Sequence, residues 1–421
     1  MIANIQKVTC NKRLKIFLLL FYATAIGWAA SVAFCETQQR VFFAAGQDMF
    51  ADFFYNVRYV AGRDPYFDTT VASSEHIYPP ICYLIFYPFA CLYRLCGTIN
   101  LAEDGLPVFW SNPIAMISCS LFMFFSAIPL VWVVWRIIWR KVSAFAGMLL
   151  LLSLLLSGIM MFSFERGNLI VLAASALAVF MVRNDDSNEK TNAGGAWLSL
   201  AVSMKIYPVL FVSLLIRKRR FGQVVLVALF TAALGFLPLL FFKHGILENA
   251  LQLMQNVKAQ GALYYNACPP NLSLSAYVAA AATVLDMNWL VFMAKVLRYG
   301  MVIIGVFSLL GIWVTEEKWK RWFLVATAAT LCSNFATYYT LLYFIPAIYS
   351  YLSSSDSFRR VDWLYSVSFT ILLTPLQFGL FPVRSDSVNP FVGACIIVVV
   401  AIVILVEGVV KILVSRWARM N

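Results

Sequence analysis

Apolar runs of helix-spanning length recur from one end of this chain to the other. A membrane-spanning helix needs about 20 predominantly apolar residues. Only 12% of the 421 residues are charged, whereas soluble domains carry about 25%. The short alternating strands of a membrane β-barrel are absent from the sequence. The pattern predicts an all-α polytopic membrane protein with about 10–12 transmembrane helices, some of them broken or re-entrant. The expected spans are about 13–35, 111–135, 142–163, 169–183, 221–242, 291–314, 363–381 and 391–413.

Basic residues gather at the ends of these runs, and this placement explains the net charge of +12. Such clusters mark cytoplasmic ends of membrane helices. The basic residues are therefore interpreted as anchors of membrane helices. The sequence shows no combination of aromatic and basic residues of the kind that binds single-stranded nucleic acid. Both termini are expected in the cytoplasm, with a first outer loop over 36–110 and a second over 243–288. The clusters are Arg136, Arg140 and Lys141; Arg217, Lys218, Arg219 and Arg220; Lys318, Lys320 and Arg321; Arg359 and Arg360; and Lys411, Arg416 and Arg419.

Two intervals have basic residues at both ends but are too short for two complete spans. Each must enter the membrane and return, with turns predicted at Met204–Pro208 and Ser333–Tyr339. Broken helices are tolerated where they line a polar cavity. The run from Tyr78 to Cys96 is interpreted as an interfacial or re-entrant helix with proline in its first turn, because a crossing would invert every later basic cluster. The whole chain, 1–421, is expected to form one membrane domain.

The polar residues outside the cytoplasmic anchors gather at the outer turns on this topology. Acids, bases and amides at several inter-span turns predict one shared outward cavity. Arg and Lys suit a phosphate, whereas amides and tyrosines suit sugar hydroxyls. The candidates for phosphate are Arg166, Lys205, Lys295 and Arg298, and those for substrate are Glu75, His76, Tyr78, Asn168, Tyr207, Asn266, Asn271, Ser273, Asn334, Tyr338 and Tyr339.

Two carboxylates follow the first span, and either can serve as a general base. Asp48 and Asp52 lie four residues apart in an aromatic, helix-prone segment. That spacing predicts that both lie on one face of a helix at the membrane boundary. Ionisable residues beside a bilayer are costly and commonly functional. At this level the choice between the two acids stays open.

The sequence predicts neither a metal nor another cofactor. The two histidines, His76 and His244, lack ligand spacing, and the nine cysteines are scattered, several within apolar runs. No glycine-rich nucleotide loop is present. A sugar donor carried by a membrane lipid is therefore expected in place of a nucleotide sugar.

Five short patterns in order resemble the GT-C superfamily of membrane glycosyltransferases, and within it glycosyltransferase family 87. Asp48 precedes Gly62 by fourteen residues, and Gly62 opens a Gly-x-x-Pro-Tyr element. The resemblance extends over about residues 40–280, and the hydropathy continues it to the C-terminus. The other four patterns are Tyr78-Pro79-Pro80, Gly167-Asn168 before an apolar run, Lys205-x-x-Pro208, and Asn271-x-Ser273.

This resemblance implies a GT-C-like fold and a polyprenyl-phosphate-linked sugar donor, often mannose. It implies inverting transfer to a lipid or glycan acceptor, with an aspartate of the first outer loop as general base. By spacing that role falls on Asp48. Family members often carry Tyr four residues later, where this chain has Asp52. The expected location is the bacterial inner (plasma) membrane, with the active site on the periplasmic or extracellular side. A transporter or flippase of a lipid-linked or anionic substrate is the alternative.

Overall fold

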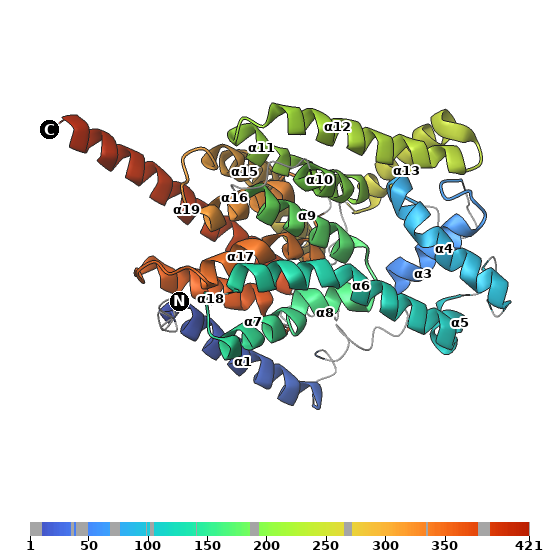
Figure 1. Cartoon of the computed structure of the whole chain (residues 1–421), viewed down its shortest axis with the longest axis horizontal. Helices are drawn as coiled ribbons and strands as arrows, with labels where there is room; N and C mark the ends of the chain where they lie inside the picture. The colour runs from blue at the N-terminus through green and yellow to red at the C-terminus, as the bar shows by residue number, and fades with distance from the viewer. Residues whose placement is uncertain are drawn as a thin grey trace, which may run out of the picture. The chain divides into compact units, whose positions relative to one another are not determined.

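A computed structural model of the chain describes residues 11–34, 38, 49–67, 76–97, 99–101, 105–139, 141–185, 193–264, 272–333, 336–377 and 388–420. These residues form α-helices and a few short 3-10 helices (Figure 1). No β-strand occurs in those ranges. The predicted all-α architecture is therefore confirmed.

The chain divides into two compact units. The central unit comprises Phe42–Pro129 and Phe162–Cys268, and the terminal unit comprises Met1–Val41, Leu130–Met161 and Pro269–Asn421. Helix α6 (Pro113–Ile138) and helix α8 (Gly158–Arg166) each run from one unit into the other. The other elements of the central unit are α3 (Ala51–Ala61), α4 (Pro80–Cys96), α5 (Leu106–Ser111), α9 (Ile170–Asp185), α10 (Ala193–Met204), η2 (Tyr207–Phe211), α11 (Val212–Arg217), α12 (Phe221–Phe236), η3 (Leu237–Phe241) and α13 (Gly245–Tyr264). Those of the terminal unit are α1 (Lys12–Val32), α7 (Ala144–Leu155), α14 (Leu274–Leu285), α15 (Asn288–Gly311), α16 (Lys318–Leu331), η4 (Tyr338–Phe344), α17 (Ile345–Leu352), α18 (Val361–Leu373) and α19 (Asn389–Met420).

Within the described residues, five helices are long and apolar enough to cross a membrane, namely α1, α6, α12 with η3, α15 and α19. Helices α7 and α8 form a sixth if their pair, bent by 45°, is one broken span. The chain is an integral membrane protein. Other apolar segments fold as shorter helices of 10–17 residues. These shorter helices include α4, α10, α14 and α18.

The first predicted turn lies where the sequence analysis expected it. Helix α10 ends at Met204 and η2 begins at Tyr207, with Pro208 in its first turn. Proline has no N–H and disfavours helical geometry in the residue before it. The apolar run is therefore interrupted at Lys205 and Ile206. The second turn separates α16 from η4.

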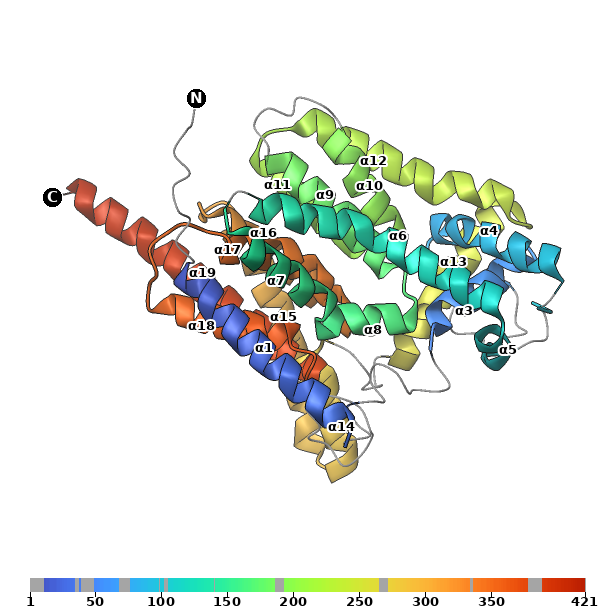
Figure 2. The same cartoon turned by 60° about the horizontal axis from the view of Figure 1, so that its bottom comes forward.

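Helices α9, α10 and α12 lie side by side in the central unit (Figures 1 and 2). Small residues allow the close contact between α10 and α12. A Cβ added to Gly195 would lie 3.4 Å from Val227. The Ser199 hydroxyl donates to the Gly195 carbonyl at 3.0 Å and to the Val227 carbonyl at 3.3 Å.

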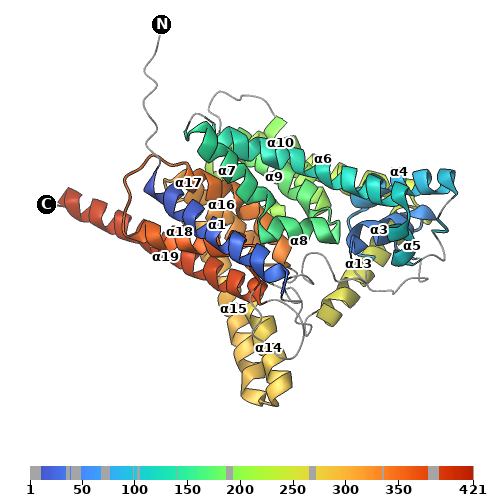
Figure 3. The same cartoon turned by 90° about the horizontal axis from the view of Figure 1, so that it is seen from below.

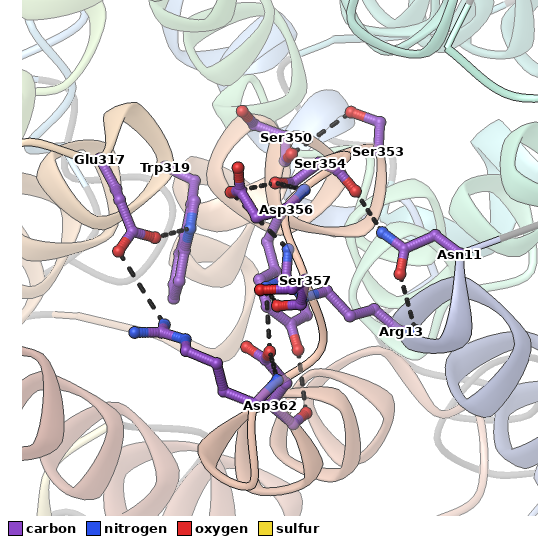
Figure 4. A network of polar contacts seen from close by, with 12 residues as sticks. Asn11, Arg13, Glu317, Trp319, Ser350, Ser353, Ser354, Asp356, Ser357 and Asp362 are labelled. Atoms are coloured by element: carbon purple, nitrogen blue, oxygen red, sulfur yellow. Dashed lines mark hydrogen bonds and ion pairs between the residues drawn. The ribbon is translucent and has the colours of Figure 1, made fainter. Parts of the chain in front are cut away.

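In the terminal unit, α1 lies along α18 (Figure 2), and α14 and α15 form a helical hairpin (Figure 3). A buried ion pair joins α1 to α18, since Arg13 Nη2 lies 2.9 Å from Asp362 Oδ2 with side chains 3% and 0% exposed. Arg13 also donates to the Ser357 carbonyl at 3.2 Å, within the network of Figure 4. A buried charge is costly unless it is paired. This pair therefore fixes the position of α1.

We expect Arg13→Met to destabilise the protein by about 3–5 kcal/mol, because it leaves the Asp362 carboxylate buried without its cation. Lys15→Met is the matched control, since Lys15 is exposed on the same helix and carries the same charge. Thermal denaturation in detergent measures both variants. Equal midpoints for the two would show that the buried pair does not hold α1. The double variant Arg13→Met with Asp362→Leu should recover much of the loss.

Candidate active site

A sharp turn between α8 and α9 builds the candidate site. Helix α8 ends at Arg166, and Gly167 follows with φ of +64°. Glycine adopts this left-handed conformation without the steric cost that other residues meet. The next residue, Asn168, accepts a hydrogen bond at its Oδ1 from the Ile170 N–H at 2.8 Å. Asn168 thereby caps the N-terminus of α9, and its Nδ2 is left to face the neighbouring elements.

The start of α3 packs directly against this turn. A Cβ added to Gly167 would lie 2.9 Å from the Phe53 Cβ and 3.3 Å from the Phe50 Cα. The Phe50 N–H donates to the Glu165 carbonyl at 2.6 Å. Phe50 itself has a left-handed backbone, with φ of 56°, and precedes the first helical residue, Ala51. The end of α8 and the start of α3 are therefore joined through their backbones.

This packing places Asp52 between a cation and an amide. Its Oδ1 accepts from Arg166 Nη2 at 3.0 Å, and its Oδ2 accepts from Asn168 Nδ2 at 2.6 Å. The side chains of Asp52 and Arg166 are 21% and 24% exposed. Asp52 also lies in the first turn of α3, where the helix dipole favours a carboxylate. Both oxygens of this partly accessible carboxylate are therefore held in place.

Two further predicted residues complete the cluster. Asn168 Nδ2 also donates to the Tyr78 hydroxyl at 3.1 Å. The Lys205 ammonium lies 4.3 Å from the centre of the Tyr78 ring, within the range of a cation–π interaction. Lys205 lies in the break between α10 and η2. The cluster therefore contains a carboxylate from α3, a guanidinium from the end of α8 and an amide from the turn after it. An ammonium from the break after α10 and a phenol from the segment before α4 complete it.

The arrangement has the groups for acid–base chemistry beside an anion. The two cations can neutralise a phosphate oxygen. The carboxylate can orient them or accept a proton. The described part of the chain contains no group of three or more His, Cys, Asp or Glu side chains arranged to hold a metal ion.

Hydrogen bonds outside this cluster hold Tyr78 in position. The Tyr66 hydroxyl donates to the Tyr78 carbonyl at 3.1 Å. Burial raises the pKa of the Tyr66 phenol well above its usual range, with smaller contributions from Tyr83 and Cys82, so this donor stays protonated. Asn256 Nδ2 on α13 donates at 3.1 Å to the carbonyls of both Tyr66 and His76. A continuous chain of contacts therefore runs from Asn256 through Tyr66 and Tyr78 to Asn168 and Asp52.

The sequence analysis did not identify Asn256 or Tyr66 as part of this site. One signal was present, because Asn249, Asn256 and Gln260 recur at helical spacing within α13. His76, expected to contact substrate, is only 1% exposed, and its Nδ1 lies 2.7 Å from the Pro65 carbonyl. Its ring lies 3.9 Å from that of Tyr59, so His76 belongs to the packing that joins α3 to α4.

One expectation about α3 is wrong. The two acids were expected on one helical face, but α3 begins at Ala51, after the left-handed Phe50. A residue with a left-handed backbone does not continue a right-handed helix. The helix that carries Asp52 therefore does not extend back to Asp48. Five predicted site residues lie outside the described ranges: Asp48, Glu75, Asn266, Asn271 and Asn334.

The remaining predicted site residues lie in or beside η2, α14, α15 and η4. Tyr207 begins η2 in the central unit. Lys295 and Arg298 lie on α15 of the terminal unit. Ser273 caps α14, since its hydroxyl accepts from the Ala276 N–H at 3.4 Å. Tyr338 and Tyr339 lie in η4, and Tyr338 is buried. Contact of these side chains with substrate stays a prediction.

A comparison with protein-family models shows the family of this chain. The model of glycosyltransferase family 87 matches residues 76–334. The chain belongs to glycosyltransferase family 87. The match includes four of the five clustered residues, namely Tyr78, Arg166, Asn168 and Lys205, and confirms the resemblance seen in the sequence. Searches of curated proteins and of solved structures found no match.

Family membership makes this integral membrane protein a glycosyltransferase, in preference to the transporter alternative. The Gly167-Asn168 pair now has a physical role in the family 87 chain. Gly167 permits the contact with α3, and Asn168 caps α9 while it binds Asp52. Both residues thus serve the same corner of the fold.

We expect Gly167→Ala to destabilise the family 87 chain by about 1–3 kcal/mol, because its Cβ would overlap Phe53 at a left-handed position. Gly222→Ala is the matched control, since a Cβ there meets nothing within 4 Å. Thermal denaturation midpoints in detergent compare the two variants. A Gly167→Ala midpoint equal to that of Gly222→Ala would contradict the close approach of α8 and α3.

Proposed function

We propose that the protein transfers a sugar, for which the family resemblance favours mannose, from a polyprenyl-phosphate donor to a lipid or glycan acceptor. The observation that carries this proposal is the cluster of Asp52, Arg166, Asn168, Tyr78 and Lys205 in a family 87 chain. Two cations beside a partly exposed carboxylate suit a phosphate that leaves as an anion. The membrane-spanning helices of the same chain suit a donor that is itself carried by lipid.

In the proposed reaction, an acceptor hydroxyl attacks the anomeric carbon of the donor. The new bond joins that carbon to the acceptor oxygen, and the bond to the phosphate oxygen breaks. The hydroxyl proton passes to an aspartate, and the polyprenyl phosphate leaves with the bond's electron pair. Arg166 and Lys205 neutralise the phosphate as its charge develops. Attack from the face opposite the leaving phosphate inverts the anomeric configuration.

We assign the general base to Asp48 and a positioning role to Asp52. Asp48 has the fourteen-residue spacing to Gly62 that the family resemblance requires. Asp52 already accepts from Arg166 and Asn168 through its two oxygens, which suits a residue that orients the phosphate-binding cation. The positive-inside distribution of basic residues supports an outer location for the site, on the periplasmic or extracellular side.

Asp48→Asn tests this assignment. Loss of a general base lowers the rate by about 10²–10⁴-fold, so we expect kcat to fall by that amount while the denaturation midpoint stays unchanged. Asp286→Asn is the matched control, because Asp286 is exposed at the end of α14, in a left-handed conformation that Asn also adopts. Transfer is measured with a synthetic polyprenyl-phosphate sugar and purified protein in detergent, without nucleotide.

Asp52→Asn, measured in parallel, separates the two acids. We expect it to raise KM for the donor and to lower the denaturation midpoint, because Arg166 loses its counter-charge. A variant of Asp52 that loses kcat with an unchanged KM and midpoint, next to an active Asp48→Asn, would transfer the base assignment to Asp52. No sugar transfer by the wild-type protein from any polyprenyl-phosphate donor would contradict the proposed donor class.

A further inference from the structure

Helix α13 presents amides to the protein and apolar side chains to its surroundings. Asn249, Asn256 and Gln260 are 0%, 7% and 5% exposed. In contrast, Leu247 and Met254 are 72% and 60% exposed. A surface helix of a soluble protein has the opposite arrangement, with its apolar stripe inward. The environment of the outward side of α13 must therefore differ from water.

Hydrogen bonds fix the inward side of this helix. Asn249 Nδ2 donates to the carbonyls of Lys243 and Gly245, both at 2.5 Å. Asn256 Nδ2 donates to the carbonyls of Tyr66 and His76, and its Oδ1 accepts from Gln252 Nε2 at 3.0 Å. Rotation of α13 about its axis would break the bonds from Asn256 to the Tyr66 and His76 carbonyls. The apolar side is consequently held outward.

The outward side is divided into an apolar strip and a polar flank. With 3.6 residues per turn, Leu247, Leu251 and Met254 fall on one strip, and all three are exposed. Glu248 and Gln255 fall on the neighbouring flank and are also exposed. Each large apolar side chain that moves from water into an apolar medium contributes about 1.5–3 kcal/mol. Three on one strip provide a strong preference for an apolar environment on that side alone.

The chain order indicates that lipid covers this strip. Helix α12 and η3 together form a candidate membrane span, Phe221–Phe241, and α13 follows it after three residues. The end of that span exposes Phe236, Leu237 and Leu240 by 55%, 62% and 64%. The apolar surface therefore continues from the span into α13, which itself carries too many polar groups to cross.

We propose that α13 lies in the membrane–water interface. Leu247, Leu251 and Met254 contact the acyl chains, whereas Glu248 and Gln255 face water. Exposed Lys243 precedes the helix, and exposed Lys258 lies on the strip itself, one turn beyond Met254; long lysine side chains extend from such positions to the anionic phosphates. The amide side holds the carbonyls of Tyr66 and His76, so the interface fixes the depth at which Tyr78 and its cluster lie.

The test places one environment-sensitive fluorescent amino acid at Met254 or at Gln255 of the full chain. These positions are neighbours in sequence but about 100° apart around the helix. The protein is reconstituted in phosphatidylcholine vesicles whose acyl chains carry bromine. We expect the probe at Met254 to lose most of its emission to the brominated lipid and to resist aqueous iodide. The probe at Gln255 should respond in the opposite way.

A second pair of probe positions, Leu251 and Glu248, repeats the comparison in case a labelled variant of the first pair does not fold. The denaturation midpoint of each labelled protein is measured alongside. Quenching of the Met254 and Leu251 probes by iodide, and not by brominated lipid, would overturn the proposal in favour of a water-exposed strip. Protection of both probes from both quenchers would also overturn it, because a protein partner or a second copy would then cover the strip. Neither outcome depends on transferase activity.

Discussion

The candidate site depends on one backbone contact, the approach of the α8–α9 turn to the start of α3. Gly167 leaves no room for a side chain there, and Phe50 donates to the Glu165 carbonyl across the same contact. Because backbones are joined, side chains on both elements are positioned together. Arg166 and Asn168, on either side of the glycine, consequently reach the two oxygens of Asp52. A larger residue at Gly167 would separate the acid from both partners.

The support for this contact extends well beyond the residues that would meet a substrate. Asn256 holds the carbonyls of Tyr66 and His76, Tyr66 holds the carbonyl of Tyr78, and Tyr78 accepts from Asn168. Each polar group along this path is bonded to the next, as buried polar groups in a low-dielectric medium require. A site held in this way keeps its geometry before a substrate arrives, and pre-organisation of this kind lowers reaction barriers.

In the terminal unit, away from the site, charged side chains are also paired with partners. Glu407 lies within the apolar helix α19, where its Oε2 lies 3.0 Å from Lys320 Nζ and accepts from the Tyr365 hydroxyl at 2.7 Å. Arg359 lies 3.1 Å from its other oxygen. Together with the Arg13–Asp362 pair, these contacts link α1, α16, α18 and α19. Ionisable residues inside membrane helices are therefore not evidence of catalysis when they are paired in this way.

The sequence by itself determined the membrane class and the approximate positions of the spanning helices, because the length of an apolar run and the position of a proline such as Pro208 or Pro80 act locally. It also supplied the resemblance to family 87 that the family match confirmed. It did not determine which partners Asp52 binds, nor that Phe50 adopts a left-handed backbone before α3 begins at Ala51, because such a conformation depends on what packs against the residue. The inward side of α13 was likewise decided only by tertiary structure, since hydrogen bonds to distant carbonyls outweigh the apolar pattern that would otherwise turn Leu247 and Met254 inward.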